Sequence, residues 1–175
     1  WEATYFDFNE DKIVSIAETA QKAGIEMLVL DDGWFGKRND DTTSLGDWFV
    51  DKNKLPNGIE GLAKRVTDIG MKFGLWFEPE MVSPDSDLYR AHPDWCLHVK
   101  NRESGLGRHQ LILDLSRADV CDYIVEFMTR ILKSAPISYV KWDMNRNMSC
   151  VGSAELDAAR QPEVYHRYLL GLYDV

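Results

Sequence analysis

Three short apolar segments, each followed by polar or acidic residues, constrain the fold more than any other feature of this sequence. They are Ile25–Leu30, Phe73–Phe77 and Tyr139–Trp142, of which the first and last each include one charged residue, and the stretches between them carry apolar residues at helical spacing. Short apolar runs are typical of parallel strands covered on both faces, and parallel strands need helical crossovers. Together with a strand-like segment at Thr4–Phe8, they predict four strand–helix units and an α/β fold with a parallel sheet.

The 3.6-residue spacing also sets the limits of the predicted helices. The first follows Asn9, a good N-cap with two acidic residues behind it, and ends at Gly24. Another follows Ser116, which has Asp119 in the spacing of a capping box, and a last one is predicted over 165–173. The apolar faces of the first three helices are formed by Ile13, Ile16, Ala17 and Ala20, by Ile59, Leu62, Ala63 and Val66, and by Val120, Ile124, Phe127 and Ile131.

Two of the segments that connect the predicted strands and helices are longer than ordinary loops. Lys37–Leu55 is polar and irregular, so we expect a functional loop there. Residues 83–107 predict loop and short helix, and Leu111–Leu115 is a possible further strand.

The position of the polar side chains favours a barrel over an open, doubly wound sheet. No G-x-G-x-x-G or G-x-x-x-x-G-K motif follows a strand, so the phosphate loops of many nucleotide-binding sheets are missing. A (β/α)₈ barrel builds its site from the ends of successive strands, where the polar residues of this chain gather. Because a whole barrel usually has about 250 residues, we expect residues 1–175 to be a single segment containing about half of one.

The stretch Tyr139–Arg146 is the clearest candidate for a catalytic site. Side chains alternate along a strand, so Lys141, Asp143 and Asn145 should share one face. The ammonium of Lys141 would keep Asp143 ionised and ready to act as a nucleophile. The alternative is a solvated Lys–Asp pair on an edge strand, which contributes little to stability.

Other strand ends supply further candidates, each with a structural alternative. Asp31 and Asp32 are either turn residues or carboxylates that accept hydrogen bonds from sugar hydroxyls. Trp76 is either packed in the core or forms a pocket wall. Arg108 is either a surface charge or a donor that reaches into the pocket.

The composition limits the kinds of binding partner and the cellular compartment that we expect for this chain. A net charge of −9 without a basic run argues against nucleic acid and anionic membranes. No apolar run is long enough to span a bilayer, and no signal segment opens the chain, so we expect a cytoplasmic protein. Three cysteines without C-x-x-C spacing are expected to be free thiols rather than disulfides or zinc ligands.

The sequence predicts no cofactor. The four histidines lack metal-site spacing, although carboxylates at strand ends leave a Mg²⁺-dependent barrel enzyme open as an alternative. Glu78 and Glu80 follow a strand around Pro79, and for both we favour a structural or supporting role.

Several of these motifs closely resemble the α-galactosidases of glycoside hydrolase family 36. The matching stretches extend from Trp1-Glu2-Ala3 to about Asn147 and include Leu30–Gly36, Leu75–Met81, Gly107–Ser116 and Tyr139–Arg146. The resemblance implies a retaining hydrolase that removes terminal α-galactose from melibiose, raffinose and similar oligosaccharides. It also implies a catalytic (β/α)₈ barrel between two β domains.

The resemblance further implies a role for each candidate. Asp143 would be the nucleophile, and galactose would be bound by Asp31, Asp32, Trp76, Arg108, Lys141 and Asn145. A retaining mechanism needs a second carboxyl about 5 Å from the first. In the family this acid/base lies in a cysteine- and glycine-rich motif on a later strand, and no such motif occurs before Val175.

The resemblance therefore implies the first half of a catalytic barrel, without the flanking domains and without activity alone. We expect the full-length protein to be a homo-oligomer. A galactosyl transferase of the same family and a non-catalytic carbohydrate-binding piece remain alternatives.

Overall fold

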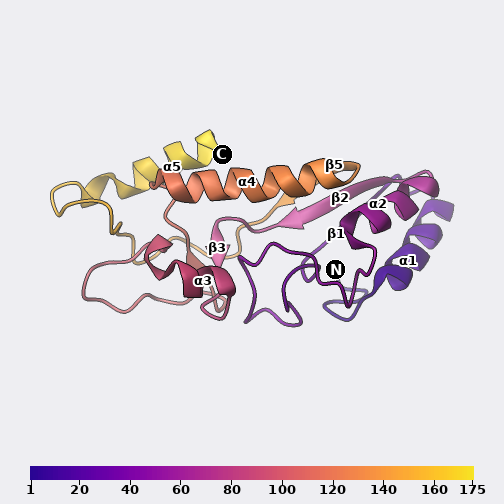
Figure 1. The fold of residues 1–175 in the computed structure, drawn as a ribbon, viewed down its shortest axis with the longest axis horizontal. Coiled ribbons are helices and arrows are strands. Elements are labelled where there is room, and N and C mark those ends of the chain that lie inside the picture. The colour runs from indigo at the N-terminus through magenta and orange to yellow at the C-terminus, as the bar shows by residue number, and fades with distance from the viewer. The chain divides into compact units, whose positions relative to one another are not determined.

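The computed structural model describes residues 1–175, and the contacts divide them into two compact units. The first unit consists of Trp1–Asp40, Trp48–Phe77 and Thr129–Asp143. The second consists of Asp41–Asp47, Glu78–Met128 and Met144–Val175. Figure 1 labels most of their helices and strands.

The first unit is built on a three-stranded parallel sheet in the order β1-β2-β5. The strands are β1 (Met27–Leu30), β2 (Lys72–Phe77) and β5 (Ile137–Trp142). Leu30 pairs with Leu75, and Phe77 pairs with Trp142, so the carboxyl ends of all three strands lie at one edge of the sheet. This is the α/β, part-barrel architecture that the strand and helix pattern predicts.

The helices of this unit follow the predicted spacing. Helix α1 (Glu10–Lys22) begins at Asn9, whose side chain accepts a hydrogen bond from the backbone of Lys12, and α2 (Gly58–Asp68) follows β1. Both helices are followed by a glycine at positive φ, +86° at Gly24 and +90° at Gly70, a conformation that side-chain-bearing residues disfavour. The buried residues of α1 and α2 include Ile13, Ala17, Ile59, Leu62, Ala63 and Val66.

The strand predicted at Thr4–Phe8 is wrong, because this segment forms turns. The carbonyl of Trp1 accepts hydrogen bonds from the backbone N–H groups of Thr4 and Tyr5, and Tyr5 has a φ of +46°. The Trp1 ring makes edge contacts with Tyr5 and Phe6. Aromatic residues favour strands only where cross-strand neighbours exist, and here they pack on their own segment instead.

The second unit contains a small antiparallel sheet and several helices. Strands β3 (Met81–Val82) and β4 (Leu111–Ile112) pair with each other, so the strand predicted at Leu111–Leu115 is shorter and lies outside the parallel sheet. The helical elements are α3 (Asp87–Ala91), η1 (Pro93–Trp95), η2 (Gln161–Glu163), α5 (Val164–Asp174) and the first part of α4 (Ala118–Ser134), whose last residues belong to the first unit.

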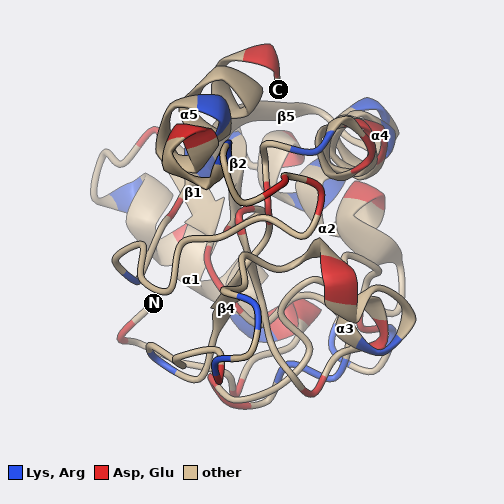
Figure 2. Cartoon of the chain, turned by 90° about the vertical axis from the view of Figure 1, so that its left-hand side faces the viewer, with Lys and Arg blue, Asp and Glu red and all other residues tan.

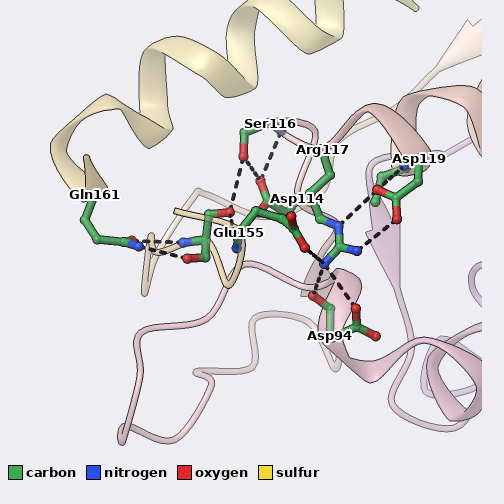
Figure 3. A network of polar contacts seen from close by, with 9 residues as sticks. Asp94, Asp114, Ser116, Arg117, Asp119, Glu155 and Gln161 are labelled. Carbon is green, nitrogen blue, oxygen red and sulfur yellow. Dashed lines mark hydrogen bonds and ion pairs between the residues drawn. The ribbon is translucent and has the colours of Figure 1, made fainter. Parts of the chain in front are cut away.

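The capping box predicted for α4 is replaced by two other contacts. The hydroxyl of Ser116 donates to Asp114 over 2.6 Å, and the carboxylate of Asp119 accepts two hydrogen bonds from the Arg117 guanidinium. Arg117 also pairs with Asp94 and Glu155, so that one cation joins three segments of the second unit (Figure 3). A nearby guanidinium attracts the carboxylate of Asp119 more strongly than the backbone N–H of Ser116 could.

Acidic and basic side chains occur together on α4 and α5 (Figure 2). None of the helices combines the length and the apolar character needed to cross a membrane.

Candidate active site

Asp143 follows the last residue of β5, at the carboxyl edge of the parallel sheet. Its backbone N–H donates to the carbonyl of Phe77 over 2.8 Å, which extends the ladder between β2 and β5 by one residue. Its Oδ2 accepts a hydrogen bond of 3.0 Å from Nε1 of Trp76. Both the backbone and one carboxylate oxygen of Asp143 are therefore fixed by β2.

Trp76 is packed in the core, as one of the two interpretations drawn from the sequence expected, and its role as a pocket wall stays a prediction. Its side chain is 2% exposed, and its ring stacks against Phe35 with centroids 6.1 Å apart. Its carbonyl accepts a hydrogen bond of 3.0 Å from the buried indole of Trp34. The indole of Trp76 is thus held by packing while its N–H reaches Asp143.

Lys141 forms an ion pair with Asp31. Its Nζ lies 2.7 Å from Oδ2 of Asp31. The hydrogen bond to Asp31 raises the pKa of Lys141 and outweighs the opposing effect of burial, and Asp143 adds a smaller Coulombic attraction. Lys141 is therefore an ammonium ion at neutral pH, which suits a hydrogen-bond donor and disfavours an amine nucleophile.

The carboxylate of Asp32 is held by a buried arginine. The Arg38 guanidinium donates from Nε to both carboxylate oxygens, over 3.1 and 3.2 Å, and from Nη2 over 2.9 Å. Arg38 is 1% exposed and Asp32 is 9% exposed. Burial raises the pKa of Asp32, although Arg38 acts in the opposite direction. Asp31 and Asp32 thus have different partners, one on the strand β5 and one in the loop that follows β1.

Lys54 completes this buried group. Its Nζ donates to the carbonyls of Gly33 and Arg38, each over 2.8 Å, and lies 5.0 Å from the centre of the Phe8 ring. Burial lowers the pKa of Lys54. The loop after β1 is therefore pinned at two carbonyls, which fixes the backbone that carries Asp32.

Arg108 and Asn145 belong to the second unit, where both line a cavity of about 590 Å³. Arg108 occupies a turn before β4, and Asn145 follows β5 in the chain. The side chain of Glu78 is 1% exposed and is hydrogen-bonded to both neighbouring segments. Its Oε1 accepts a hydrogen bond of 2.6 Å from the backbone N–H of Asn145, and its Oε2 accepts one of 3.0 Å from Nε2 of Gln110. Glu80 accepts a hydrogen bond from Tyr168, so both glutamates have the supporting contacts expected of them.

The Melibiase family model matches residues 1–175. The chain belongs to the Melibiase family. The resemblance to the α-galactosidases of glycoside hydrolase family 36 is thereby confirmed.

Relatives of this Melibiase-family chain are much longer than it is. Alpha-galactosidase AgaA of Geobacillus stearothermophilus is 66% identical over 175 residues, which are 100% of this chain and 24% of that protein. Alpha-galactosidase Mel36A of Lactobacillus acidophilus is 55% identical, with the same coverage. The crystal structure of AgaA superposes with a TM-score of 0.97 over 99% of this chain and 24% of its own. The chain therefore spans about a quarter of the length of these relatives.

Within this Melibiase-family chain the predicted site residues fall into two groups. The first unit brings together Asp31, Trp76, Lys141 and Asp143, with Asp32 held separately by Arg38. The second unit brings together Arg108 and Asn145. No group of three His, Cys, Asp or Glu side chains is placed as metal ligands would be.

Sequence reasoning missed the residues that hold these groups in place. They are Trp34, Arg38, Lys54, Gln110 and Arg146. Arg38 and Lys54 lie in the loop Lys37–Leu55, which also contains Lys37, Lys52 and four aspartates, so its composition does not single them out. The contact between Trp34 and Trp76 joins residues 42 positions apart and has no local pattern.

Proposed function

We propose that this chain carries the nucleophile and the galactose-binding residues of a retaining α-galactosidase. The substrates would be terminal α-D-galactosides such as melibiose and raffinose. The observation that carries the proposal is the Asp143 carboxylate at the strand end, held at 3.0 Å by Trp76 beside the Lys141–Asp31 pair. The proposal is supported by the relatives named α-galactosidase, and by solved variants of AgaA in complex with raffinose and with stachyose.

In this mechanism a carboxylate oxygen of Asp143 attacks the anomeric carbon of the galactosyl group. The bond to the leaving oxygen breaks, a second carboxyl protonates that oxygen, and water later hydrolyses the galactosyl–Asp143 ester. The Trp76 N–H holds one oxygen of the nucleophile, which orients the other oxygen. The sugar hydroxyls would be bound by Asp31, Asp32, Trp76, Arg108, Lys141 and Asn145.

The second carboxyl is expected outside these 175 residues. We therefore propose that the chain is the first half of a catalytic barrel in a longer protein, and that it has no meaningful hydrolase activity alone. Coverage of 24% of the relatives' length supports this view. A cytoplasmic location is supported by the free cysteines Cys96, Cys121 and Cys150. A homo-oligomeric full-length protein is part of the same proposal.

A chimera tests the proposed activity. In it, this chain replaces the matched 175 residues of AgaA. The assay measures release of p-nitrophenol from p-nitrophenyl α-galactoside. We expect the chimera to hydrolyse the substrate, the 175-residue chain alone to be inactive, and Asp143→Asn to lower kcat by at least about 10³-fold while galactose still binds. Asp68→Asn on the exposed surface of α2 is the matched control and should leave the rate unchanged.

Other outcomes would favour the alternative functions. Galactose binding by the chimera without turnover would indicate a non-catalytic module. Transfer of galactose to an acceptor sugar without release of free galactose to water would indicate a transferase. Loss of the rate with a chelator would indicate the metal-dependent alternative, and each of these results contradicts the hydrolase proposal.

A further inference from the structure

Arg108 lies in a turn whose backbone is unfavourable for its residues. Gly107 and Gln110 close the turn with backbone hydrogen bonds in both directions, of 3.3 and 3.0 Å. Between them Arg108 has a φ of +50° and His109 a φ of +60°. Turns with two central residues at positive φ strongly prefer glycine, asparagine and aspartate. A side-chain-bearing pair persists in this conformation only where its surroundings hold it.

Arg146 makes the contacts that hold this turn. Its Nη1 donates to the carbonyl of Gly105 over 3.0 Å and to the carbonyl of Gln110 over 2.5 Å, one before the turn and one after it. Its Nε donates to Asn147 and its Nη2 to the hydroxyl of Ser149. Three of these four hydrogen bonds go to backbone carbonyls and one to a hydroxyl, so the guanidinium connects its own segment to the backbone on both sides of the turn.

The fit between Arg146 and the turn is also steric. A Cβ atom at Gly107 would lie 3.2 Å from Nε and 3.4 Å from Cζ of Arg146. The guanidinium therefore lies directly against the turn. Nη1 alone reaches both carbonyls, while Nε and Nη2 of the same planar group donate to Asn147 and Ser149. The rigid guanidinium keeps these donors in fixed directions, whereas a lysine ammonium is a single point charge on a flexible stem.

Glu78 supplies a second connection between the same two segments. It joins the Gln110 side chain on one side to the Asn145 backbone on the other. Arg146 and Glu78 therefore tie the turn that carries Arg108 to the segment that carries Asn145. Both Arg108 and Asn145 line the cavity of about 590 Å³ in this unit.

We propose that Arg146 is a positioning residue that holds Arg108 in its binding geometry. This inference rests on the proposed function, because Arg108 would bind the galactosyl group. Arg146 lines the same cavity, but its guanidinium nitrogens donate to oxygens of Gly105, Gln110, Asn147 and Ser149, so its hydrogen-bonding capacity is used within the protein. Its substitution should therefore act through Arg108 and alter substrate binding rather than the chemical step.

A double-mutant cycle in the AgaA chimera tests the proposal. We expect Arg146→Lys to raise KM about tenfold with a small change in kcat, since a misplaced binding group can cost up to about 10²-fold. In the Arg108→Lys background, Arg146→Lys should change KM less than about threefold, because residues acting as a unit are not additive. Arg102→Lys, an exposed arginine of the preceding loop, is the matched control and should leave both constants unchanged.

Two results would overturn the proposal. If the effects of the two substitutions multiply, Arg146 acts independently of Arg108. If Arg146→Lys lowers the unfolding midpoint and the active fraction while KM stays the same, its role is only structural.

A second measurement does not depend on activity. Hydrogen–deuterium exchange of the chimera should be faster by about tenfold or more at the amides of Gly107 and Gln110 in Arg146→Lys, and unchanged in α5. Unchanged exchange at the turn would contradict the positioning role. If the unsubstituted chimera is inactive, the proposed function fails, and this exchange result alone decides the role of Arg146.

Discussion

Trp76 connects the packed interior with the carboxylate proposed as the nucleophile. Its ring is buried against Phe35, and its N–H bonds to Asp143. Packing fixes the ring, so the N–H donor needs no rearrangement before the reaction. A carboxylate held in this way is restricted to few orientations, which favours attack along one direction.

Replacing Trp76 by phenylalanine tests this connection. The variant keeps an aromatic ring but loses the N–H donor to Asp143. We expect kcat/KM of the chimera to fall about 10- to 100-fold, which corresponds to the ~1.5–3 kcal/mol of a hydrogen bond to a charged group. Phe35→Leu alters the packing of Trp76 without removing a donor and serves as the control. Equal losses of activity in the two variants would show that packing alone matters.

Arg38 gives a prediction with a defined pH dependence. Arg38→Met leaves the Asp32 carboxylate buried and unpaired, and we expect a loss of about 3–5 kcal/mol in the free energy of unfolding at pH 7. Burial already raises the pKa of Asp32 above its usual 3.8, and losing the cation raises it further. The folded variant therefore binds this proton more tightly than the unfolded chain does, and its stability falls as the pH rises from 3.8 through the raised pKa.

Urea unfolding at several pH values measures this effect. The difference in stability between Arg38→Met and the unsubstituted chain should shrink toward acidic pH, where Asp32 is neutral. Lys64→Met removes an exposed ion pair with Asp68 and should cost no more than about 1 kcal/mol at any pH. A pH-independent difference for Arg38→Met would contradict the argument.

Among the site residues, the sequence predicted those at strand ends and missed those that hold them. Asp31, Lys141 and Asp143 could be proposed from the sequence because a polar residue near the end of an apolar strand or just after it has no packing role. Arg38 and Lys54 were missed because their contacts close loops of several residues and leave no periodic pattern. The sequence predicted a Coulombic attraction between Lys141 and Asp143, which the structure contains, but it did not predict the ion pair with Asp31. Alternation along a strand gives the face of a side chain but not its partner on a neighbouring strand.

Gly171 allows helix α5 to approach the backbone of another segment of the second unit closely. A Cβ atom at Gly171 would overlap the carbonyl oxygen of Leu115. The thiol of Cys121 donates to the same carbonyl over 3.3 Å. The helix therefore packs directly against backbone that has no room to move.

Gly171→Ala should displace α5. We expect a loss of about 1–3 kcal/mol in the free energy of unfolding from overpacking, although alanine has the better helix propensity by ~1 kcal/mol. Circular dichroism during urea unfolding of the 175-residue chain measures the effect. Leu169→Ala, on an exposed position of the same helix, should cost less. A stabilised Gly171→Ala variant would mean that the close contact is not maintained in solution.

Elements with strong periodicity were predicted well, and elements without it were not. The helices at 10–22, 58–68, 118–134 and 164–174 follow apolar spacing that tertiary packing reinforces. The strand expected at Thr4–Phe8 failed because β propensity needs a neighbouring strand. The expected capping box failed because Asp114 and Arg117 offered charged partners that the local motif did not include.

At the scale of the whole molecule, the parallel sheet of the first unit has β1 and β5 at its ends. Tyr139 and Trp142 of β5 are 48% and 37% exposed, which is unusual for a parallel strand. Edge strands with exposed apolar residues promote association with other strands. We expect the isolated 175-residue chain to self-associate, as measured by light scattering after gel filtration.

A charged residue introduced on β5 tests whether this strand causes the self-association. Tyr139→Lys should reduce self-association, because a lysine on an edge strand opposes pairing. Val125→Lys, an equally exposed apolar position on α4, is the control and should have little effect. A monomeric unsubstituted chain at the same concentration would refute the argument from the sheet edges.

The two indole hydrogen bonds, from Trp34 to the carbonyl of Trp76 and from Trp76 to Asp143, form a short chain from a wholly buried ring to the proposed nucleophile. A screen of random variants for lost turnover should consequently recover hits far from any sugar-contacting surface. Trp34→Phe is the first such hit to look for. Directed evolution of the chimera should therefore vary the loops and leave the hydrophobic interior unchanged.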